Sequence, residues 1–265
     1  MSNAISYAEP VEVDSPDNCF WYHTMDLPGH GLVEGAWDFR GQDEFFFSNT
    51  KFAGKRVLEI GPATGALGFR MEALGAEVTS VELPSGNNWD VVPLAAANPV
   101  RVFAGRETNM RRVKRSYWLS HRALGSKNRV ISCSAYDTPH ESGPYDIAYF
   151  ASVLTHMQNP FQALRHNLDM TTERVIIVEQ YHPDWTPETP GANITFQPDC
   201  RNPDFYDTWW TFTPTALVKM VGVLGFEKVV LVLHEQLCGK DQTPVPLATI
   251  IADRTRPPFK AIQEN

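Results

Sequence analysis

Two glycines and a glutamate stand where a nucleotide-like ligand could bind. Gly61 and Gly65 follow the apolar run at 56–60, and Glu82 closes the next apolar run along the chain. Glycine has no Cβ, so its backbone can pass close to a ligand, and a carboxylate after the second strand can accept hydrogen bonds from both ribose hydroxyls. The dinucleotide fingerprint G-x-G-x-x-G requires glycine at position 63, which is Ala63. The pattern therefore predicts a nucleotide-like ligand and disfavours an NAD-linked dehydrogenase.

The elements that must position these residues follow from an alternation of short apolar runs and helical segments. This alternation predicts an α/β fold with a doubly wound, mostly parallel sheet and helices on both faces. The last two strands are expected to pair as an antiparallel hairpin at one sheet edge. The expected strands are 56–60, 77–81, 129–134, 145–150, 174–179, 227–233 and 248–252, and the expected helices are 67–74, 94–125, 161–169 and 214–225.

The chain divides into three expected parts. Residues 1–18 are polar and are expected to be flexible. Residues 19–50 are rich in aromatic side chains and are interpreted as an N-terminal cap, with a short strand or hairpin and a helix. Residues 51–265 form the main domain, and 182–213 within it holds so many prolines that no regular structure is expected there. A loop of this length in a compact domain is usually functional, so we interpret it as a lid-like insertion.

The bulk composition disfavours some classes of partner. The formal net charge of -8 disfavours a nucleic acid, because phosphate contacts need lysine or arginine. The basic cluster at 111–115 is more simply the surface of a helix than a phosphate site. The four cysteines form no C-x-x-C pair, which indicates reduced thiols in a cytoplasmic protein and no zinc site. No apolar run approaches the roughly 20 residues that span a bilayer, and no secretory signal is visible, so no membrane partner is expected.

The stretch 57–68, taken with Glu82, resembles motif I of the class I S-adenosylmethionine-dependent methyltransferases. The resemblance implies a Rossmann-like sheet of seven strands, with S-adenosylmethionine as cofactor and S-adenosylhomocysteine as product. It also implies which residues contact the cofactor. Glu59 would hold the ammonium, Gly61, Pro62 and Gly65 the methionine part, Glu82 the ribose, Leu83, Tyr136 and Asp137 the adenine, and Ala151 the wall of the cleft.

Residues 151–156, after the fourth expected strand, reduce the number of methyl-transfer reactions that the resemblance allows. Methyltransferases that act on base amino groups carry N-P-P-Y or D-P-P-Y here, and catechol-type enzymes place acidic metal ligands here. This chain reads Ala-Ser-Val-Leu-Thr-His and offers neither. The resemblance therefore favours a metal-independent transfer to oxygen, ahead of carbon or nitrogen.

Three further stretches resemble a narrower bacterial subgroup, related to the tRNA wobble-uridine carboxymethyltransferase. The first is Trp21-Tyr22-His23-Thr24 with Asp26-Leu27 and Trp37, and the second is Leu83-Pro84-Ser85 followed by Trp89-Asp90. The third is Tyr136-Asp137 leading to 154–160. The RNA-modifying member has a longer and more basic chain, so its substrate is not carried over. A small-molecule acceptor fits the acidic charge better, and the donor is left open between S-adenosylmethionine and a carboxymethyl form.

A hydroxyl acceptor must lose its proton during methyl transfer, and histidine is the usual base near neutral pH. Three histidines lie near expected strand ends or in the cap: His23, His156 and His182. Each also has a structural interpretation, and one of the three is expected to be the base. Aromatic side chains of the cap and the insertion suit either core packing or a lid over an aromatic acceptor. They are Trp21, Tyr22, Tyr181, Phe205, Tyr206, Trp209 and Trp210.

Three functions follow from these patterns. The first is a methyltransferase that acts on a small molecule, and the second is a methyl- or carboxymethyltransferase that acts on an RNA base. The third is a non-catalytic regulator that retains the fold. Intact Gly61, Gly65, Glu82 and Asp137 disfavour the third, because a decayed site would lose some of them. The oligomeric state is not predicted.

Overall fold

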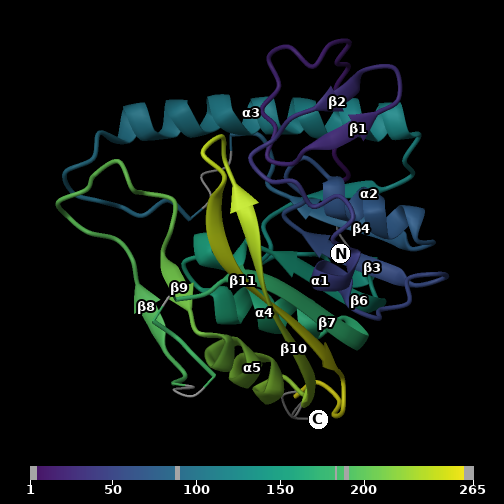
Figure 1. The fold of residues 1–265 in the computed structure, drawn as a ribbon, viewed down its shortest axis with the longest axis vertical. Coiled ribbons are helices and arrows are strands. Elements are labelled where there is room, and N and C mark those ends of the chain that lie inside the picture. Colours follow the sequence, from purple (N-terminus) through teal and green to yellow (C-terminus); the bar gives the residue numbers. More distant parts are fainter. Residues whose placement is uncertain (1–4, 87–89, 183, 188–190, 260–265) are drawn as a thin grey trace, which may run out of the picture.

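A seven-stranded sheet forms the centre of the protein, as the computed structural model shows (Figure 1). The described residues are 5–86, 90–182, 184–187 and 191–259, so Trp89 lies outside them. Five strands run parallel, and the last two form the antiparallel pair at one edge. In spatial order the strands are β10 (Lys228–Cys238), β11 (Thr243–Asp253), β7 (Thr171–Gln180), β6 (Tyr145–Ala151), β3 (Arg56–Ile60), β4 (Glu77–Glu82) and β5 (Arg129–Ser132). The predicted doubly wound, mostly parallel sheet is confirmed.

Helices cover both faces of this sheet, and the alternation of side chains along β3 shows why. Leu58 and Ile60 pack in one core cluster with α4 (Pro160–Leu168) and α5 (Pro214–Val223). Val57 points the other way and packs with α1 (Asp43–Phe47) and α2 (Ala66–Ala73). Because neighbouring residues in a strand face opposite sides, a nearly continuous apolar run fills two cores at once.

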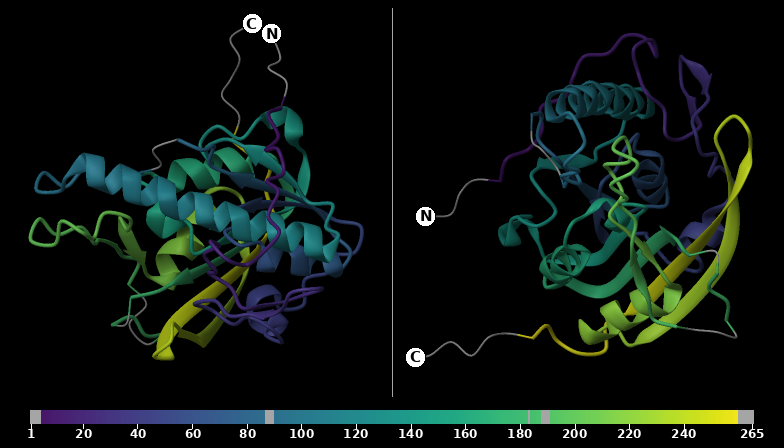
Figure 2. Two further views of the ribbon diagram at one scale, coloured as in Figure 1. Left: turned by 90° about the horizontal axis from the view of Figure 1, so that it is seen from above. Right: turned by 90° about the vertical axis from the view of Figure 1, so that its left-hand side faces the viewer.

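The longest helix is α3 (Pro99–Leu124), which lies within the expected helical range 94–125. It begins where the Asn98 side chain accepts a hydrogen bond from the Arg101 amide at 3.1 Å, and it ends at Gly125 with φ of 63°. Its C-terminal half packs in a third core cluster through Tyr117 and Trp118. Figure 2 shows that the first turns of α3 project beyond the sheet, beside the loop of the insertion.

The cap at 19–50 contains both of its expected elements. An antiparallel hairpin of β1 (Met25–Leu27) and β2 (Gly31–Val33) precedes helix α1. The residues before the cap, from residue 5 on, lie against the domain. The Ala8 amide donates to the Val130 carbonyl at 2.8 Å, and Val13 is buried. The described part of the segment that was expected to be flexible therefore borders edge strand β5.

The insertion contains regular structure, which the density of prolines did not predict. Strands β8 (Ile194–Phe196) and β9 (Trp210–Phe212) pair antiparallel within 182–213. The described prolines of this segment lie outside both strands, so neither strand loses a backbone donor. The described residues also contain two single-turn 3-10 helices, η1 (His140–Ser142) and η2 (Leu154–His156). In the part of the chain that the structure describes, no helix combines the length and the apolar character that crossing a membrane requires.

Candidate active site

A cavity of about 950 Å³ opens at the carboxyl ends of the parallel strands. The cap, α3 and the insertion supply its remaining walls. The predicted site residues that line it are Tyr22, His23, Glu59, Gly61, Pro62, Glu82, Leu83, Tyr136, Asp137, Ala151 and His156. The predicted site residues that lie outside its wall are Trp21, Gly65, Tyr181, His182, Trp209 and Trp210.

The glycine turn after β3 separates the roles of its two glycines. Gly61 lines the cavity with φ of +70°, and a Cβ there would lie 2.9 Å from a methyl carbon of Val153. Gly65 caps α2 with φ of +86°, and a Cβ there would meet the Phe69 ring at 2.3 Å. Both positions need the left-handed backbone that glycine adopts without strain. Gly61 therefore shapes the cavity wall, and Gly65 shapes the turn behind it.

Glu59 is a buried carboxylate, 3% exposed, under the start of α2. Ser80 Oγ donates to Glu59 Oε2 at 2.6 Å, and Asn128 Nδ2 donates to Ser80 Oγ at 2.9 Å. A Cβ on Gly68 would lie 2.3 Å from the same carboxylate oxygen, so the helix can approach only because this residue is glycine. Burial raises the pKa of Glu59 to about 7. The carboxylate is thus oriented by the protein before any ligand binds.

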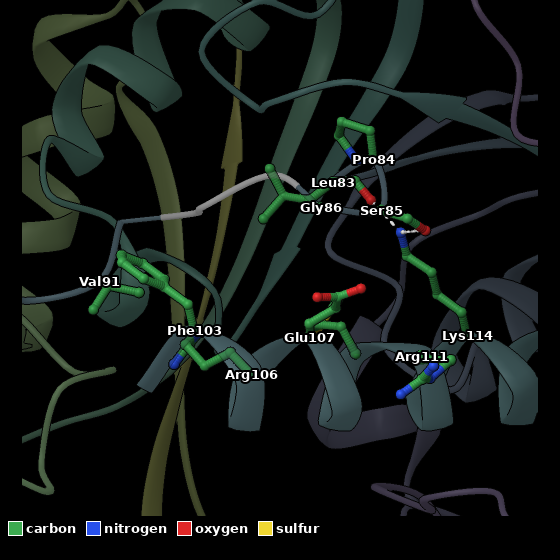
Figure 3. Close-up of a pocket in the computed structure, with 11 residues that line it drawn as sticks. Leu83, Pro84, Ser85, Gly86, Val91, Phe103, Arg106, Glu107, Arg111 and Lys114 are labelled. Atoms are coloured by element: carbon green, nitrogen blue, oxygen red, sulfur yellow. Dashed lines mark hydrogen bonds between the residues drawn. The ribbon is translucent and has the colours of Figure 1, made fainter. Parts of the chain in front are cut away.

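Glu82 is the last residue of β4, and its carboxylate lies against the backbone of the next residue. The Leu83 amide donates to Glu82 Oε1 at 2.7 Å, and burial raises the pKa of Glu82. Figure 3 shows Lys114 of α3 reaching this segment, where its ammonium donates to the Leu83 carbonyl. One lysine of the basic cluster 111–115 therefore anchors α3 beside Glu82. A carboxylate held in this way suits a ligand with neighbouring hydroxyls.

The turn after β5 places both candidate adenine contacts on the wall, since Tyr136 and Asp137 each line the cavity. The Asp137 amide donates to the Ser134 carbonyl at 2.9 Å, which closes the turn. The Tyr136 hydroxyl donates to Asp90 Oδ2, and the Gln158 amide donates to the same oxygen at 2.7 Å. Asp90 thus joins the segment after β4 to the segment after η2.

The turn after β6 rests on a second buried carboxylate, that of Glu179. Glu179 stands near the end of β7, is 1% exposed and lines the cavity. It accepts the Leu154 amide at 2.8 Å, with the Val153 and Thr155 amides close by. Burial raises the pKa of Glu179 to about 8. Because Val153 packs on Gly61, Glu179 supports the wall that faces the glycine turn.

The insertion is tied to that turn by its two tryptophans. The Trp209 amide donates to the Thr155 carbonyl at 2.9 Å, and Thr155 Oγ1 donates to the Trp210 carbonyl. The Trp209 indole donates to the Asp90 carbonyl, and the Trp210 indole donates to the Met157 carbonyl at 3.0 Å. Trp209 and Trp210 thus anchor the insertion. The insertion residues that line the cavity are Gln197, Phe205, Tyr206, Asp207, Thr208 and Thr211.

The three candidate histidines occupy different environments. His156 lines the cavity, and its Nδ1 is hydrogen-bonded to the Asp207 carbonyl. The ring is open to the cavity on one side. Protein atoms around its other sides desolvate the ring, and this lowers the pKa of His156. His23 is buried with Nδ1 2.7 Å from Thr64 Oγ1, and burial lowers its pKa to about 4. His182 lies outside the wall with Nδ1 3.6 Å from Asp184 Oδ2.

The remaining predicted contacts pack elsewhere. Trp21 packs against the cluster that contains Val13, Cys19 and Leu119. Tyr181 forms an edge-on ring contact with Trp185, with centroids 5.6 Å apart. Core packing, one of the two interpretations of these aromatic residues, accounts for both positions.

Several residues on the wall were not predicted as site residues. They are Trp37, Phe39, Asp90, Arg106, Asn109, Met110, Val113, Glu179 and Gln180. Positions 106, 109, 110 and 113 of α3 follow the spacing i, i+3, i+4, i+7, which is one face of a helix. That spacing in the sequence indicates that the four residues share one face of the helix. It does not predict that this face lines the cavity.

Comparisons with known proteins agree with this geometry. A family model described as a methyltransferase domain matches residues 42–231. The N-terminal domain of EvdMO1 with S-adenosylhomocysteine bound is similar in structure, with a TM-score of 0.52, 14% identity, and 89% of this chain and 92% of that chain covered. The 1,6-didemethyltoxoflavin-N1-methyltransferase of Burkholderia thailandensis gives 0.50 and 13%, with 82% and 78% covered. No curated protein sequence matches this chain.

The family model covers most of the chain, and the similar structures have the same fold. The chain therefore belongs to the class I S-adenosylmethionine-dependent methyltransferases.

Proposed function

We propose that this enzyme methylates an oxygen of a small-molecule acceptor, without a metal ion and with His156 as general base. S-adenosylmethionine, when bound, supplies a methyl group made electrophilic by the attached sulfonium. The residues of this chain bind the cofactor, orient the acceptor and remove its proton. In this proposal Glu59 holds the ammonium, Gly61 and Pro62 the methionine part, Glu82 the ribose, Leu83, Tyr136 and Asp137 the adenine, and Ala151 borders the methyl group.

The fit of these residues to the cofactor rests on three observations. The cavity of about 950 Å³ exceeds the volume that one nucleoside-sized ligand needs and leaves space for an acceptor. Gly61 lines the wall where the methionine part would lie, and a Cβ there would collide with Val153 of the same wall. The buried Glu59 and the half-buried Glu82 each offer a carboxyl group, already oriented by a protein donor, to the cationic and hydroxyl groups of the ligand.

The choice of His156 rests on its hydrogen bond with the Asp207 carbonyl. A carbonyl oxygen only accepts, so Nδ1 must donate and carry the proton. Nε2 of the neutral ring is then the basic nitrogen, and the lowered pKa favours that neutral form. Burial lowers the pKa of His23 to about 4, too low for an efficient base at neutral pH, and His182 lies outside the cavity. His156 is therefore the candidate that combines position with tautomer.

The small size of the acceptor is supported by the position of the insertion and by charge. The insertion, anchored by Trp209 and Trp210, forms one side of the cavity. The net charge of -8 works against a polyanionic partner. One similar structure of the EvdMO1 domain was obtained in the presence of D-fucose, and the toxoflavin enzyme holds its own small substrate. The resemblance to the tRNA-modifying subgroup stays a prediction, and salt-dependent binding of tRNA would favour it instead.

Calorimetric titration with S-adenosylmethionine, and separately with NADH, is the first test. Micromolar binding of S-adenosylmethionine alone is expected, and binding of neither would favour a non-catalytic protein. A screen of hydroxylated acceptors for methyl transfer follows, with and without EDTA. EDTA should not change the rate.

Variants then test the base. His156→Gln should keep cofactor affinity and lose at least 100-fold in turnover, the usual contribution of a general base. His182→Gln is the matched control and should remain active. Full activity of His156→Gln would remove His156 from the mechanism.

A further inference from the structure

One edge of the central sheet is an apolar strand without the usual protection. β10 is the edge strand, and its stretch 228–236 holds two residues that are charged at neutral pH, Lys228 and Glu235. The stretch contains no proline, and no bulge interrupts its register with β11. Natural sheets protect such edges with charges, prolines or bulges, because an open edge pairs readily with another strand. The exposed apolar side chains here are Val230, Leu231 and Leu233, at 52%, 38% and 37%.

The backbone polar groups of this edge point out of the sheet. The Tyr181 amide donates to the Pro246 carbonyl, so Pro246 directs its polar atoms toward β7 and away from Glu235, its partner on β10. In such a pair the polar atoms of both residues point apart, so Glu235 and every second residue before it face outward. No described residue across this edge pairs with them. The outward-facing residues are Val229, Leu231, Leu233 and Glu235.

The cap covers only the far end of β10. The Gly239 amide donates to the Ala36 carbonyl at 2.7 Å, and Trp37 forms an antiparallel bridge with Cys238. This bond also shows that odd-numbered residues of the strand face outward. The open stretch is therefore 228–236, which corresponds to about 30 Å of strand. In the right-hand view of Figure 2, the hairpin of β10 and β11 forms one side of the molecule.

A second copy of this chain fits the open stretch in a defined register. In an antiparallel pair, opposite side chains lie on the same face of the sheet, so a two-fold axis places odd residues opposite odd residues. Pairing all of 228–236 with itself puts this axis at Val232. Leu231 then lies opposite Leu233 of the second copy, and Val229 lies opposite Glu235 of the second copy. Each outward-facing residue thereby meets another outward-facing residue.

The charges of the strand agree with this register. Lys228 would lie opposite Gln236 of the second copy, and Glu235 opposite Val229. No two like charges would face each other across the axis. The leucines at 231 and 233 of both copies would instead form one apolar cluster beside the axis.

The helices beside β10 widen the edge. On one face, the Phe45 ring of α1 stacks on His234 with centroids 5.3 Å apart. On the other face, Val229 packs in the cluster that contains α5. A strand about 30 Å long between two helix layers of about 10 Å offers about 600 Å². This area is at the lower end of the roughly 600–1,000 Å² that each partner of a stable complex buries.

We propose that the protein is a homodimer in which β10 pairs antiparallel with β10 of a second copy, with the two-fold axis at Val232. The paired edges form a continuous sheet of fourteen strands, seven from each copy. Because the axis is perpendicular to the sheet, the parallel strands of the two copies end on opposite sides of the dimer. The two cavities therefore open in opposite directions. The inference does not depend on the proposed function.

Gel filtration with light scattering, at micromolar concentration, tests the oligomeric state. The unchanged protein should have twice the mass of one chain. Leu231→Lys combined with Leu233→Lys brings four ammonium groups together at the axis and should give a monomer with an unchanged circular dichroism spectrum. Val100→Lys combined with Leu124→Lys is the matched control on α3, at positions 77% and 39% exposed, and should remain a dimer. A monomeric unchanged protein, or a dimer that persists in the β10 variant, overturns the inference.

Engineered cysteines test the register. Val232→Cys would lie opposite its own copy in a pair whose Cα atoms are about 4.5 Å apart, a distance that a disulfide spans. Mild oxidation should therefore give a covalent dimer, above the background that the natural cysteines give in the unchanged protein. Val230→Cys is the control, because its two copies would lie about 13 Å apart along the strands and should not cross-link. Cross-linking at 230 in place of 232, or at neither position, contradicts the proposed pairing.

Discussion

The carboxylate of Glu179 accepts the backbone amide of Leu154 at 2.8 Å, and this bond joins the end of β7 to the turn after β6. The turn has contacts on both of its sides. Val153 packs on Gly61 of the glycine turn, and Thr155 holds the insertion through Trp209 and Trp210. The buried Glu179 side chain thus supports both the cavity wall beside the glycine turn and the attachment of the insertion.

Replacing Glu179 by glutamine should destabilise the protein by about 1–3 kcal/mol, because an amide group of the new side chain would face backbone donors. Urea unfolding at pH 9, above the pKa of about 8 at which Glu179 ionises, measures this change in the free energy of unfolding. Glu235→Gln changes the same chemical group on exposed β10 and should alter stability by less than about 0.5 kcal/mol. Equal stability of the two variants would show that Glu179 does not support the turn.

The raised pKa of Glu59 predicts a specific dependence of stability on pH. The folded protein keeps the Glu59 proton up to about pH 7, while the unfolded chain loses it near 4.5. Folded protein therefore binds more protons in this window, and its stability should fall as pH rises from about 4.5 through 7. Glu59→Gln should make that decline shallower. Urea midpoints at pH 5, 6, 7 and 8 compare the two proteins, and parallel declines would contradict the assignment.

Glu82→Ala should weaken binding of S-adenosylhomocysteine by about 1–3 kcal/mol, roughly 5- to 150-fold, since the ribose hydroxyls would lose their acceptor. Glu77→Ala removes an exposed carboxylate from the other end of β4 and should leave the affinity unchanged. Calorimetric titration measures both variants. An unchanged affinity in Glu82→Ala would remove Glu82 from the ribose site.

Trp209→Phe should loosen the insertion, because phenylalanine cannot donate to the Asp90 carbonyl. Amide hydrogen exchange should become faster in a peptide covering 205–211, and the rest of the sheet should not change. Trp185→Phe loses a comparable indole bond, to Thr215 Oγ1, at a place outside the cavity wall. Exchange at 205–211 should stay slow in that control, and fast exchange in both would mean that Trp209 is no specific anchor.

The sequence predicted most of the central sheet because its strands carry short apolar runs between helical segments. It underestimated the final hairpin, expected at 227–233 and 248–252, since Pro244 and Pro246 argue against a strand. The Pro246 carbonyl accepts the Tyr181 amide, so Pro246 directs its backbone polar atoms toward β7, where that ladder ends. The missing donor therefore costs no bond to β10.

Part of the candidate site was predictable because ligands of open α/β sheets bind beyond the carboxyl ends of the strands. Glu82 comes directly from that rule, Glu59 and Asp137 were implied by the resemblance to the methyltransferases, and all three line the cavity. Arg106 and Asp90 follow from neither, because one lies inside a helix and the other in an irregular segment. Their positions depend on how α3 and the insertion pack, which local patterns do not encode.

The spatial order of the sheet has a consequence for biosynthesis. β11 is the last strand among the described residues, but it lies inside the sheet, between β10 and β7. Until residue 253 has left the ribosome, the buried edge of β7 from Val175 to Val178 has no neighbour on that side. A nascent or prematurely terminated chain therefore exposes an unpaired apolar strand, a template for aggregation that chaperones would have to cover. The central sheet of this enzyme can therefore close only after its β11 segment has emerged.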